Sequence, residues 1–189
     1  MGKIIIDISM SVDGFIAGQN MSAKLPMGDS GLELHNWLFH SKTATDEKVI
    51  QETVANAGAV IVGGNTYKFA IEEAWEGVSP FTVPAFVLLQ TAPAIKIDGF
   101  NFISGGIEDI LQHAKAEAGD KNIWVMGGAN IIQQFIKARL FDELHVHLAP
   151  LILGKGIKLF GELIDEKIKL ENIEMIQTPA ATHLKFKRL

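Results

Sequence analysis

Residues 59–67 are Ala-Val-Ile-Val-Gly-Gly-Asn-Thr-Tyr, and residues 123–131 are Ile-Trp-Val-Met-Gly-Gly-Ala-Asn-Ile. Each stretch opens with a short apolar run typical of a buried strand and continues through paired glycines into a helical pattern. Glycine allows a ligand close to the backbone, and the start of a helix offers free N–H groups to a phosphate. The two stretches therefore predict an α/β sheet that binds a phosphate-bearing ligand at the carboxyl ends of its strands.

The polar residues Thr66 and Asn130, which follow the two glycine pairs, could add hydroxyl and amide donors to such a site. The alternative is that each glycine pair only makes a tight turn from strand to helix. Neither stretch contains the G-x-G-x-x-G fingerprint, so the sequence does not support a Rossmann domain.

Strand and helix patterns alternate through most of the chain, which is typical of a sheet with helices on its faces. The last third changes to strands without an intervening helix, which predicts an antiparallel hairpin at a sheet edge. The expected strands are 3–10, 59–62, 85–89, 100–103, 123–126, 143–153, 170–177 and 182–188, and the expected helices begin near 45, 107 and 131. The predicted fold class is thus α/β, with a mixed, mostly parallel central sheet flanked by helices.

Two other segments bear on a binding site. Residues 17–36 are rich in Gly, Asn, Ser and Met and predict a long loop of the kind that covers ligands. Asp13 and Gly14 follow the first strand, where a carboxylate either caps a turn or points into a cleft. In a dry cleft, such a carboxyl group could orient a substrate or pass a proton.

His145 and His147 lie two positions apart in an expected strand, so both imidazoles face the same side. This spacing can hold a metal and raises the hypothesis of a metal-dependent hydrolase. Ordinary strand residues explain the pair better, because no further group of ligands follows, and the prediction is that the chain binds no metal.

Composition excludes several classes of protein. The 189 residues suit one domain over residues 1–189, and the net charge of -5 argues against a nucleic-acid binder. No apolar run approaches the roughly 20 residues of a membrane helix. The chain has no cysteine, so disulfides and thiolate nucleophiles are excluded. Asp7 interrupts the apolar start, which predicts a strand rather than a signal peptide and favours the cytoplasm.

Five motifs occur in an order that resembles the dihydrofolate reductase-like family, in particular the C-terminal reductase domain of riboflavin biosynthesis (RibD) in its stand-alone bacterial form. Each motif is weak alone, but together they span essentially the whole chain. They are Ser11-Val12-Asp13-Gly14-Phe15-Ile16-Ala17, Gly63-Gly64-Asn65-Thr66-Tyr67, Val125-Met126-Gly127-Gly128-Ala129, Leu140-Phe141-Asp142-Glu143-Leu144, and Pro150-Leu151-Ile152-Leu153-Gly154-Lys155-Gly156 with Leu159-Phe160.

The resemblance implies an NADPH-dependent reductase, with NADH as a possible cofactor, that transfers a hydride to a small heterocyclic or related unsaturated substrate. It also implies a homodimer. By position, Asp13 would be catalytic and would contact substrate together with Leu153 and Gly154. The residues implied for the cofactor are Gly63, Gly64, Asn65, Thr66, Gln90, Thr91, Gly127, Gly128, Ala129 and Asn130.

The sequence departs from the family pattern at three positions. Gly64 stands where the family has an arginine, so a cofactor phosphate lacks that bidentate partner, and Lys42 and Lys68 are the candidate substitutes. Met126 and Phe15 replace a glutamate and a lysine of the riboflavin-pathway reductases, which argues against a ribosylated pyrimidine as substrate. The alternative function is a non-catalytic protein that binds a nucleotide or another small ligand on the same scaffold.

Overall fold

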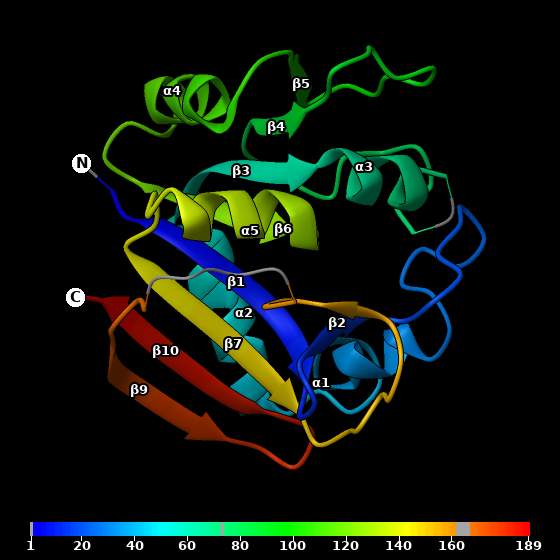
Figure 1. The fold of residues 1–189 in the computed structure, drawn as a ribbon, viewed down its shortest axis with the longest axis vertical. Helices are drawn as coiled ribbons and strands as arrows, with labels where there is room; N and C mark the ends of the chain where they lie inside the picture. Colours follow the sequence, from blue (N-terminus) through cyan, green and yellow to red (C-terminus); the bar gives the residue numbers. More distant parts are fainter. Residues whose placement is uncertain (1, 73, 162–166) are drawn as a thin grey trace.

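The computed structural model describes residues 2–72, 74–161 and 167–189. Its main sheet has eight strands in the order β5-β4-β3-β6-β1-β7-β10-β9 (Figure 1). The strands of this sheet are β1 (Ile4–Ser11), β3 (Ala57–Gly63), β4 (Ala85–Leu88), β5 (Phe100–Ile103), β6 (Asn122–Gly127), β7 (Glu143–Ala149), β9 (Leu170–Gln177) and β10 (Thr182–Arg188). A smaller antiparallel sheet pairs β2 (Phe15–Ala17) with β8 (Ile157–Lys158).

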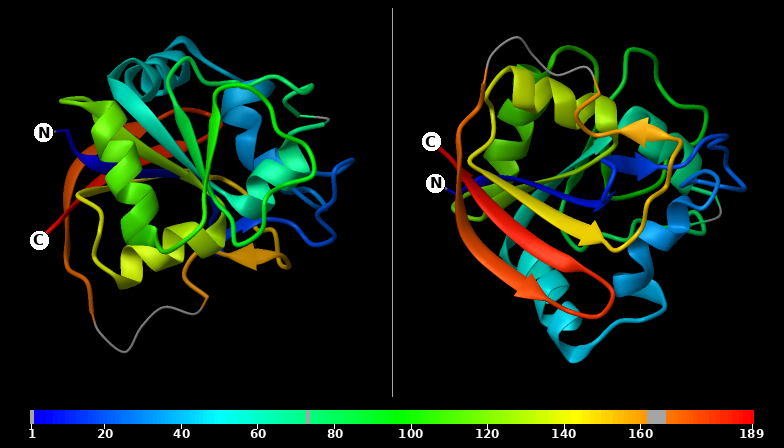
Figure 2. Two further views of the ribbon diagram at one scale, coloured as in Figure 1. Left: turned by 90° about the horizontal axis from the view of Figure 1, so that it is seen from above. Right: turned by 60° about the horizontal axis from the view of Figure 1, so that its bottom comes forward.

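The main sheet is mixed and mostly parallel, as predicted. Neighbouring strands run parallel from β5 through β7, and only β10 and β9 run antiparallel to their neighbours. The hairpin of β9 and β10 lies at the margin of the sheet, with β9 outermost (Figure 2). The antiparallel C-terminal hairpin at a sheet edge is therefore confirmed.

Helices cover both faces of the sheet (Figure 1). On one face, α4 (Ile107–Ala118) and α5 (Ala129–Lys137) pack on a core that contains Ile6, Ile61 and Val125. On the other face lie α2 (Ala44–Asn56), α3 (Gly64–Ala70) and a short pair of turns, η1 (Gly31–His35) and α1 (Asn36–Phe39). The apolar stripes predicted for the helices near 107 and 131 are the faces that α4 and α5 bury.

Local sequence explains where the helix α2 begins. The side chain of Thr43 accepts a hydrogen bond from the backbone N–H of Asp46, and the Asp46 carboxylate accepts one from the N–H of Thr43. This capping box satisfies two N–H groups that the first turn would otherwise leave unpaired. It fixes the start of α2 against β10, where Asp46 is completely buried.

The structure differs from the sequence predictions in two places. Residues 31–36, the end of the predicted loop 17–36, form η1 and the first residue of α1, because Leu34 and Trp37 are buried there and anchor the segment to the sheet. The strand predicted to reach Leu153 ends at Ala149. Pro150 follows directly and has no N–H to continue the ladder of hydrogen bonds.

Among the described residues, none of the helices has both the length and the apolar character required to cross a membrane.

Candidate functional site

A cleft of about 1830 Å³ opens at the carboxyl ends of the parallel strands. It is larger than a typical pocket for a drug-sized ligand. All ten residues implied for the cofactor line it, from the ends of β3, β4 and β6 and the turns that follow them. These residues are Gly63, Gly64, Asn65, Thr66, Gln90, Thr91, Gly127, Gly128, Ala129 and Asn130.

The two glycine pairs meet at the floor of this cleft. A Cβ atom on Gly63 would lie 2.8 Å from the backbone nitrogen of Gly128, so the ends of β3 and β6 could not approach this closely with any larger residue. Gly127 has φ 129°, a conformation that residues with side chains rarely adopt. The helix α5 starts directly behind it, and its N-cap, Gly128, has no side chain to bond the first-turn N–H groups. The pair thus forms a narrow cradle lined by backbone.

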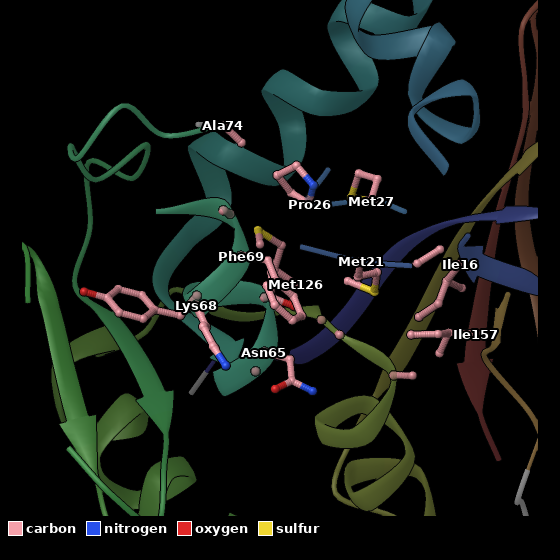
Figure 3. A pocket seen from close by; sticks show the side chains of 18 of the residues that line it. Ile16, Met21, Pro26, Met27, Asn65, Lys68, Phe69, Ala74, Met126 and Ile157 are labelled. Carbon is pink, nitrogen blue, oxygen red and sulfur yellow. The ribbon is translucent and has the colours of Figure 1, made fainter. Parts of the chain in front are cut away.

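Two walls of different character face each other across the cleft (Figure 3). Asn65, Lys68 and Phe69 of α3 stand on one wall, and on the other Met21 and Met27 project from the long loop predicted to cover a ligand. Ile16 of β2 and Ile157 of β8 extend this second wall. The walls offer apolar surface for a flat ring, together with the Asn65 amide and the Lys68 ammonium group, and Lys24 and Lys158 also line the cleft.

Polar side chains lie at the inner end of the cleft. Asp7 and Ser9 of β1, His147 of β7, and His35 and Trp37 from η1 and α1 all line it. The indole N–H of Trp37 donates to the Ser9 hydroxyl over 2.9 Å, and the indole ring lies 4.4 Å from the His147 ring. The Nδ1 atom of His35 is buried without a hydrogen-bond partner among the described residues. This end of the cleft suits a ligand with polar ring atoms.

Burial and neighbouring charge set the ionisation of this polar group. Burial alone would raise the pKa of Asp7, but His147 and His145 outweigh it, so the pKa lies well below its usual range and the carboxyl is ionised. Burial lowers the pKa of His35 to about 4, against a smaller opposing effect of the Gly31 carbonyl. The inner end therefore presents a carboxylate beside a neutral imidazole.

Sequence analysis missed Asp7, Ser9, His35 and Trp37 as candidate site residues. A signal was present in the first strand, where Asp7, Ser9 and Ser11 alternate with apolar residues and so share one face of the sheet. The register pairs Asp7 with His145 and Ser9 with His147, which gathers the polar positions of two strands on that face. Such pairing depends on strand order, which periodicity alone does not supply.

Asp13 lies outside the set of residues that line the cleft. Its carboxylate accepts hydrogen bonds from the Ser11 hydroxyl at 2.6 Å and from the backbone N–H groups of Leu153 and Gly154 at 3.0 and 2.7 Å. These bonds, the one from Ser11 foremost, lower the pKa of Asp13 to about 2. The structure thus brings Asp13, Leu153 and Gly154 together as an anchor between two loops, and their roles toward a substrate stay predictions.

The two lysines proposed to replace the family arginine differ in position. Lys68 lines the cleft, with its amine 5.6 Å from the centre of the Phe69 ring. Lys42 does not line it and forms an ion pair with Glu47 on α2. Lys68 is therefore the better placed of the two to meet a phosphate in the cleft.

His145 and His147 face the same side of β7, as predicted, but both rings bond to carboxylates. His147 contacts Asp7 and His145 contacts Glu143. Over the described parts of the chain, no group of three or more His, Cys, Asp or Glu side chains has an arrangement that could hold a metal ion.

Comparisons with known proteins give relatives along the whole chain. The uncharacterized proteins YwjB and YyaP of Bacillus subtilis (strain 168) are each 27% identical to it, over 96% and 93% of this chain and 96% and 87% of theirs. The riboflavin biosynthesis protein RibD of Bacillus amyloliquefaciens is 34% identical over 74 residues, which are 39% of this chain and 18% of that protein.

Solved structures share the fold. A putative riboflavin biosynthesis protein from Shewanella sp. PV-4 has a TM-score of 0.77 at 24% identity and covers 99% of both chains. Dihydrofolate reductase from Enterococcus faecalis, complexed with NADP(H) and RAB-propyl, has a TM-score of 0.64 at 16% identity, over 98% of this chain and 96% of that one. These likenesses confirm the predicted dihydrofolate reductase-like fold.

The family model described as the RibD C-terminal domain matches residues 2–184. This match confirms the resemblance that the five motifs indicated, and it supports a reductase-type function. The chain belongs to the RibD C-terminal domain family.

Proposed function

We propose that this protein is an oxidoreductase that uses a reduced nicotinamide dinucleotide, NADPH in preference to NADH, to reduce a small unsaturated heterocycle. The observation that carries the proposal is the convergence of ten residues, predicted from three separate segments, on the edge of one cleft. Membership of the RibD C-terminal domain family and the glycine cradle lined by backbone atoms also support a dinucleotide as the ligand.

The residues of the cleft fit such a cofactor. The cradle of Gly63, Gly127 and Gly128 leaves room for a pyrophosphate close to the backbone, and the start of α5 supplies N–H groups and a positive dipole end. Thr66 and Asn130 stand beside it as hydroxyl and amide donors. When bound, the cofactor supplies the hydride, and the protein supplies orientation and a shielded pocket.

The substrate is assigned to the inner end of the cleft. Asp7, Ser9 and His35 offer a carboxylate, a hydroxyl and an unpaired ring nitrogen, which are suited to the N–H and carbonyl groups of a heterocycle. Met21 and Met27 of the loop provide apolar surface over the ring. Met126 and Phe15, which replace charged residues of the riboflavin-pathway reductases, favour an uncharged substrate over a ribosylated pyrimidine.

The proposal is tested by titrating purified protein with NADPH and with NADH in a thermal-shift assay. A nucleotide present at about 100 times its dissociation constant stabilises the native state by about 2.7 kcal/mol. Oxidation of the bound nucleotide is then followed as the loss of absorbance by the reduced nicotinamide, in the presence of each member of a panel of uncharged heterocycles. Binding with turnover supports the reductase, and binding without turnover supports the non-catalytic alternative. Absence of binding to either nucleotide contradicts the reductase and favours a non-catalytic scaffold for another small ligand.

Cofactor preference is tested with a matched pair of lysine variants. Lys68→Met removes the ammonium group that lines the cleft, and Lys42→Met removes one that does not. Loss of one charge-assisted contact predicts about a tenfold weaker affinity for NADPH in Lys68→Met, with NADH unaffected. Equal effects of both variants, or equal effects on both nucleotides, would contradict a role of Lys68 in recognising the additional phosphate.

A further inference from the structure

A row of ionisable side chains is buried under α2, on the face of the sheet opposite α4 and α5. It contains Asp7 of β1, His145 and His147 of β7, His183 of β10 and Asp46 of α2. Their exposed fractions are between 0% and 6%. Strand register explains the row, because Asp7 pairs with His145 and His147 pairs with His183. Burial of so many ionisable groups is costly unless each is bonded, so their hydrogen bonds determine which protons they hold.

The central four groups form a continuous chain of short contacts. His147 Nε2 lies 2.9 Å from Asp7 Oδ1, and His183 Nε2 lies 2.8 Å from Asp46 Oδ1. Between them, the Nδ1 atoms of the two histidines are 2.8 Å apart. Each imidazole thus has one nitrogen on a carboxylate and the other on its neighbouring imidazole.

The geometry fixes the number of protons in this chain. An ionised carboxylate can only accept, so each Nε2 atom carries a proton. The contact between the two Nδ1 atoms also needs one proton, because otherwise two lone pairs would face each other at 2.8 Å. The His147–His183 pair therefore holds three protons on four nitrogens and carries one positive charge between two carboxylates.

The electrostatic surroundings agree with this count. Burial would raise the pKa of Asp46, but hydrogen bonds from Thr43 and His183 outweigh it and lower that pKa. Burial lowers the pKa of His183, and the hydrogen bond to Asp46 opposes this shift. Asp7, whose carboxylate contacts His147, is the counter-ion on that side.

One end of the chain reaches the main cleft, which Asp7 and His147 line. A branch from the same carboxylate leaves the core through His145, whose Nδ1 lies 3.6 Å from Asp7 Oδ2 and whose Nε2 lies 3.0 Å from Glu143. Glu143 accepts a hydrogen bond from the Lys3 ammonium at 2.6 Å, and the Lys3 side chain is 59% exposed. Glu143, His145 and Lys3 line a second cleft of about 460 Å³.

Other charged groups that face the row already have partners or are neutral. The Lys185 ammonium contacts Glu52 of α2 at 2.9 Å and Glu174 of β9 at 2.7 Å. The Thr53 hydroxyl of α2 donates to Asp7 Oδ2 at 3.1 Å. His35, on the cleft side, is held neutral by burial, which lowers its pKa to about 4.

We propose that the His147–His183 pair stores one proton for the reaction in the main cleft and is refilled from the second cleft through Glu143 and His145. In the step, the Nε2–H bond of His147 breaks as Asp7 Oδ1 takes the proton, and Asp7 passes a proton to the substrate atom that forms the new bond to hydrogen. Asp7 ends unchanged, the pair becomes neutral, and the substrate gains one proton. The hydride comes separately from the nicotinamide, so this last step rests on the proposed function.

The first experiment measures the stored proton on the protein alone. Long-range ¹H–¹⁵N spectra of protein labelled at histidine are recorded at neutral pH, with His147 and His183 assigned by substitution. We expect three N–H protons on the pair, one on each Nε2 atom and one between the two Nδ1 atoms. His183→Gln, whose amide can replace Nε2 toward Asp46 but not Nδ1, removes the shared proton and leaves His147 neutral. Two neutral imidazoles in the wild type would overturn the proposal.

The second experiment measures the path to solvent by exchange of the histidine N–H protons with deuterated water. We expect Glu143→Gln, which cannot pass a proton, to slow exchange at His145 by at least about tenfold, because His145 does not line the main cleft and only rarer local opening then remains for it. The Trp37 indole N–H, buried beside the pair but bonded to Ser9, is the internal reference and keeps its rate. His113→Gln on the exposed side of α4 is the matched control.

The outcomes separate this proposal from the proposed function. If Glu143→Gln also speeds exchange at Trp37, the variant has loosened the fold, and Glu143→Met, which also cannot pass a proton, then gives the same comparison at His145. Unchanged exchange at His145 in a variant with a normal Trp37 rate would overturn the relay. Both measurements use no nucleotide and no substrate, so failure to bind NADPH leaves their result intact.

Discussion

Asp13 is the residue for which sequence and structure suggest different roles. Its carboxylate accepts three hydrogen bonds, from Ser11, Leu153 and Gly154, and so joins the end of β1 to the segment after β7. Low pKa and multiple backbone donors are typical of a carboxylate that fixes a turn. Proton handling by Asp13, expected for a carboxylate in a dry cleft, stays a prediction, and we propose this role for Asp7, which lines the cleft.

Asp13→Asn tests the anchoring role. The amide can accept fewer of these hydrogen bonds, so we expect Tm to fall by a few degrees, with NADPH affinity unchanged because Asp13 lies outside the cleft. Calorimetry and nucleotide titration measure the two effects. A variant with wild-type Tm but reduced turnover would instead show that Asp13 orients the substrate, as the sequence prediction holds.

His35 makes a separate contribution to the pH dependence of stability. Its pKa is about 4 in the folded protein, mainly through burial, against about 6.5 for an ordinary histidine. Below about pH 6.5 the unfolded chain binds a proton that the native state does not. The stabilising contribution of neutral His35 is therefore complete above pH 6.5 and is lost as the pH falls toward 4, to a total of roughly 2–3 kcal/mol.

Substitution isolates this contribution from that of the other buried groups. Urea unfolding of His35→Gln between pH 7 and about pH 4 should show a smaller loss of free energy of unfolding than the wild type, because glutamine does not titrate. His40→Gln, in the exposed residue that follows α1, should keep the wild-type slope. Parallel slopes for wild type and His35→Gln would contradict a depressed pKa at this position.

At the scale of elements, the approach of β3 to β6 decides whether a cofactor cradle exists. Gly63→Ala places a methyl group 2.8 Å from the Gly128 nitrogen and 3.2 Å from the Gly127 oxygen, both of which are backbone atoms without freedom to rotate away. We expect a loss of about 1–3 kcal/mol in stability from this overpacking and weaker binding of either nucleotide. Equilibrium unfolding and nucleotide titration measure both quantities.

Gly106→Ala is the matched control for this substitution. Gly106 precedes α4, far from the cradle in sequence, and its nearest neighbour would be the flexible end of the Glu108 side chain at 3.2 Å. It should leave nucleotide binding unchanged. If Gly63→Ala binds NADPH as tightly as Gly106→Ala does, close approach of the backbone at Gly63 is not required for the cofactor.

Elements also show how far the sequence determines this fold. Strands such as β5, β9 and β10 were predicted with the observed limits, because apolar runs bounded by turn residues carry a strong local signal. The two glycine pairs also carry a local signal, because each ends a strand just before a helix, and both pairs line the cleft. The prediction of a loop was wrong for residues 31–36, since Leu34 and Trp37 gain their helical turns from burial against the sheet. The row of Asp7, His147 and His183 could not be predicted, because it depends on the order β1-β7-β10.

For the whole molecule, the two faces of the sheet differ in what they bury. The face under α4 and α5 is an apolar core, whereas the face under α2 holds ionised and hydrogen-bonded groups. Apolar side chains of similar volume would provide comparable stability without a desolvation cost, which buried ion pairs recover only when their geometry is good. The row of buried ionisable groups connects two clefts, which is the arrangement expected when a fold retains buried charge for chemistry rather than for stability.

The outermost strand, β9, leads to the last prediction, a homodimer. Every residue of β9 except Ile176 is exposed, and it pairs with β10 on one side only. Ile173 and Met175 are 44% and 66% exposed. Long edge strands with exposed apolar residues commonly pair with another chain, and proteins that remain monomeric usually protect such an edge with charge. We therefore propose that two copies associate through β9.

Met175→Lys places a positive charge in this apolar surface and should shift the protein from dimer to monomer, which light scattering after size-exclusion chromatography measures as a halved mass. Val78→Lys, at an equally exposed apolar residue outside the main sheet, is the control and should keep the mass of the wild type. Association through β9 would bury the exposed edge beside the second cleft, to which Ile173 and Glu174 contribute. A wild-type protein that is monomeric at micromolar concentration would exclude the dimer, and a dimer insensitive to Met175→Lys would place the interface elsewhere.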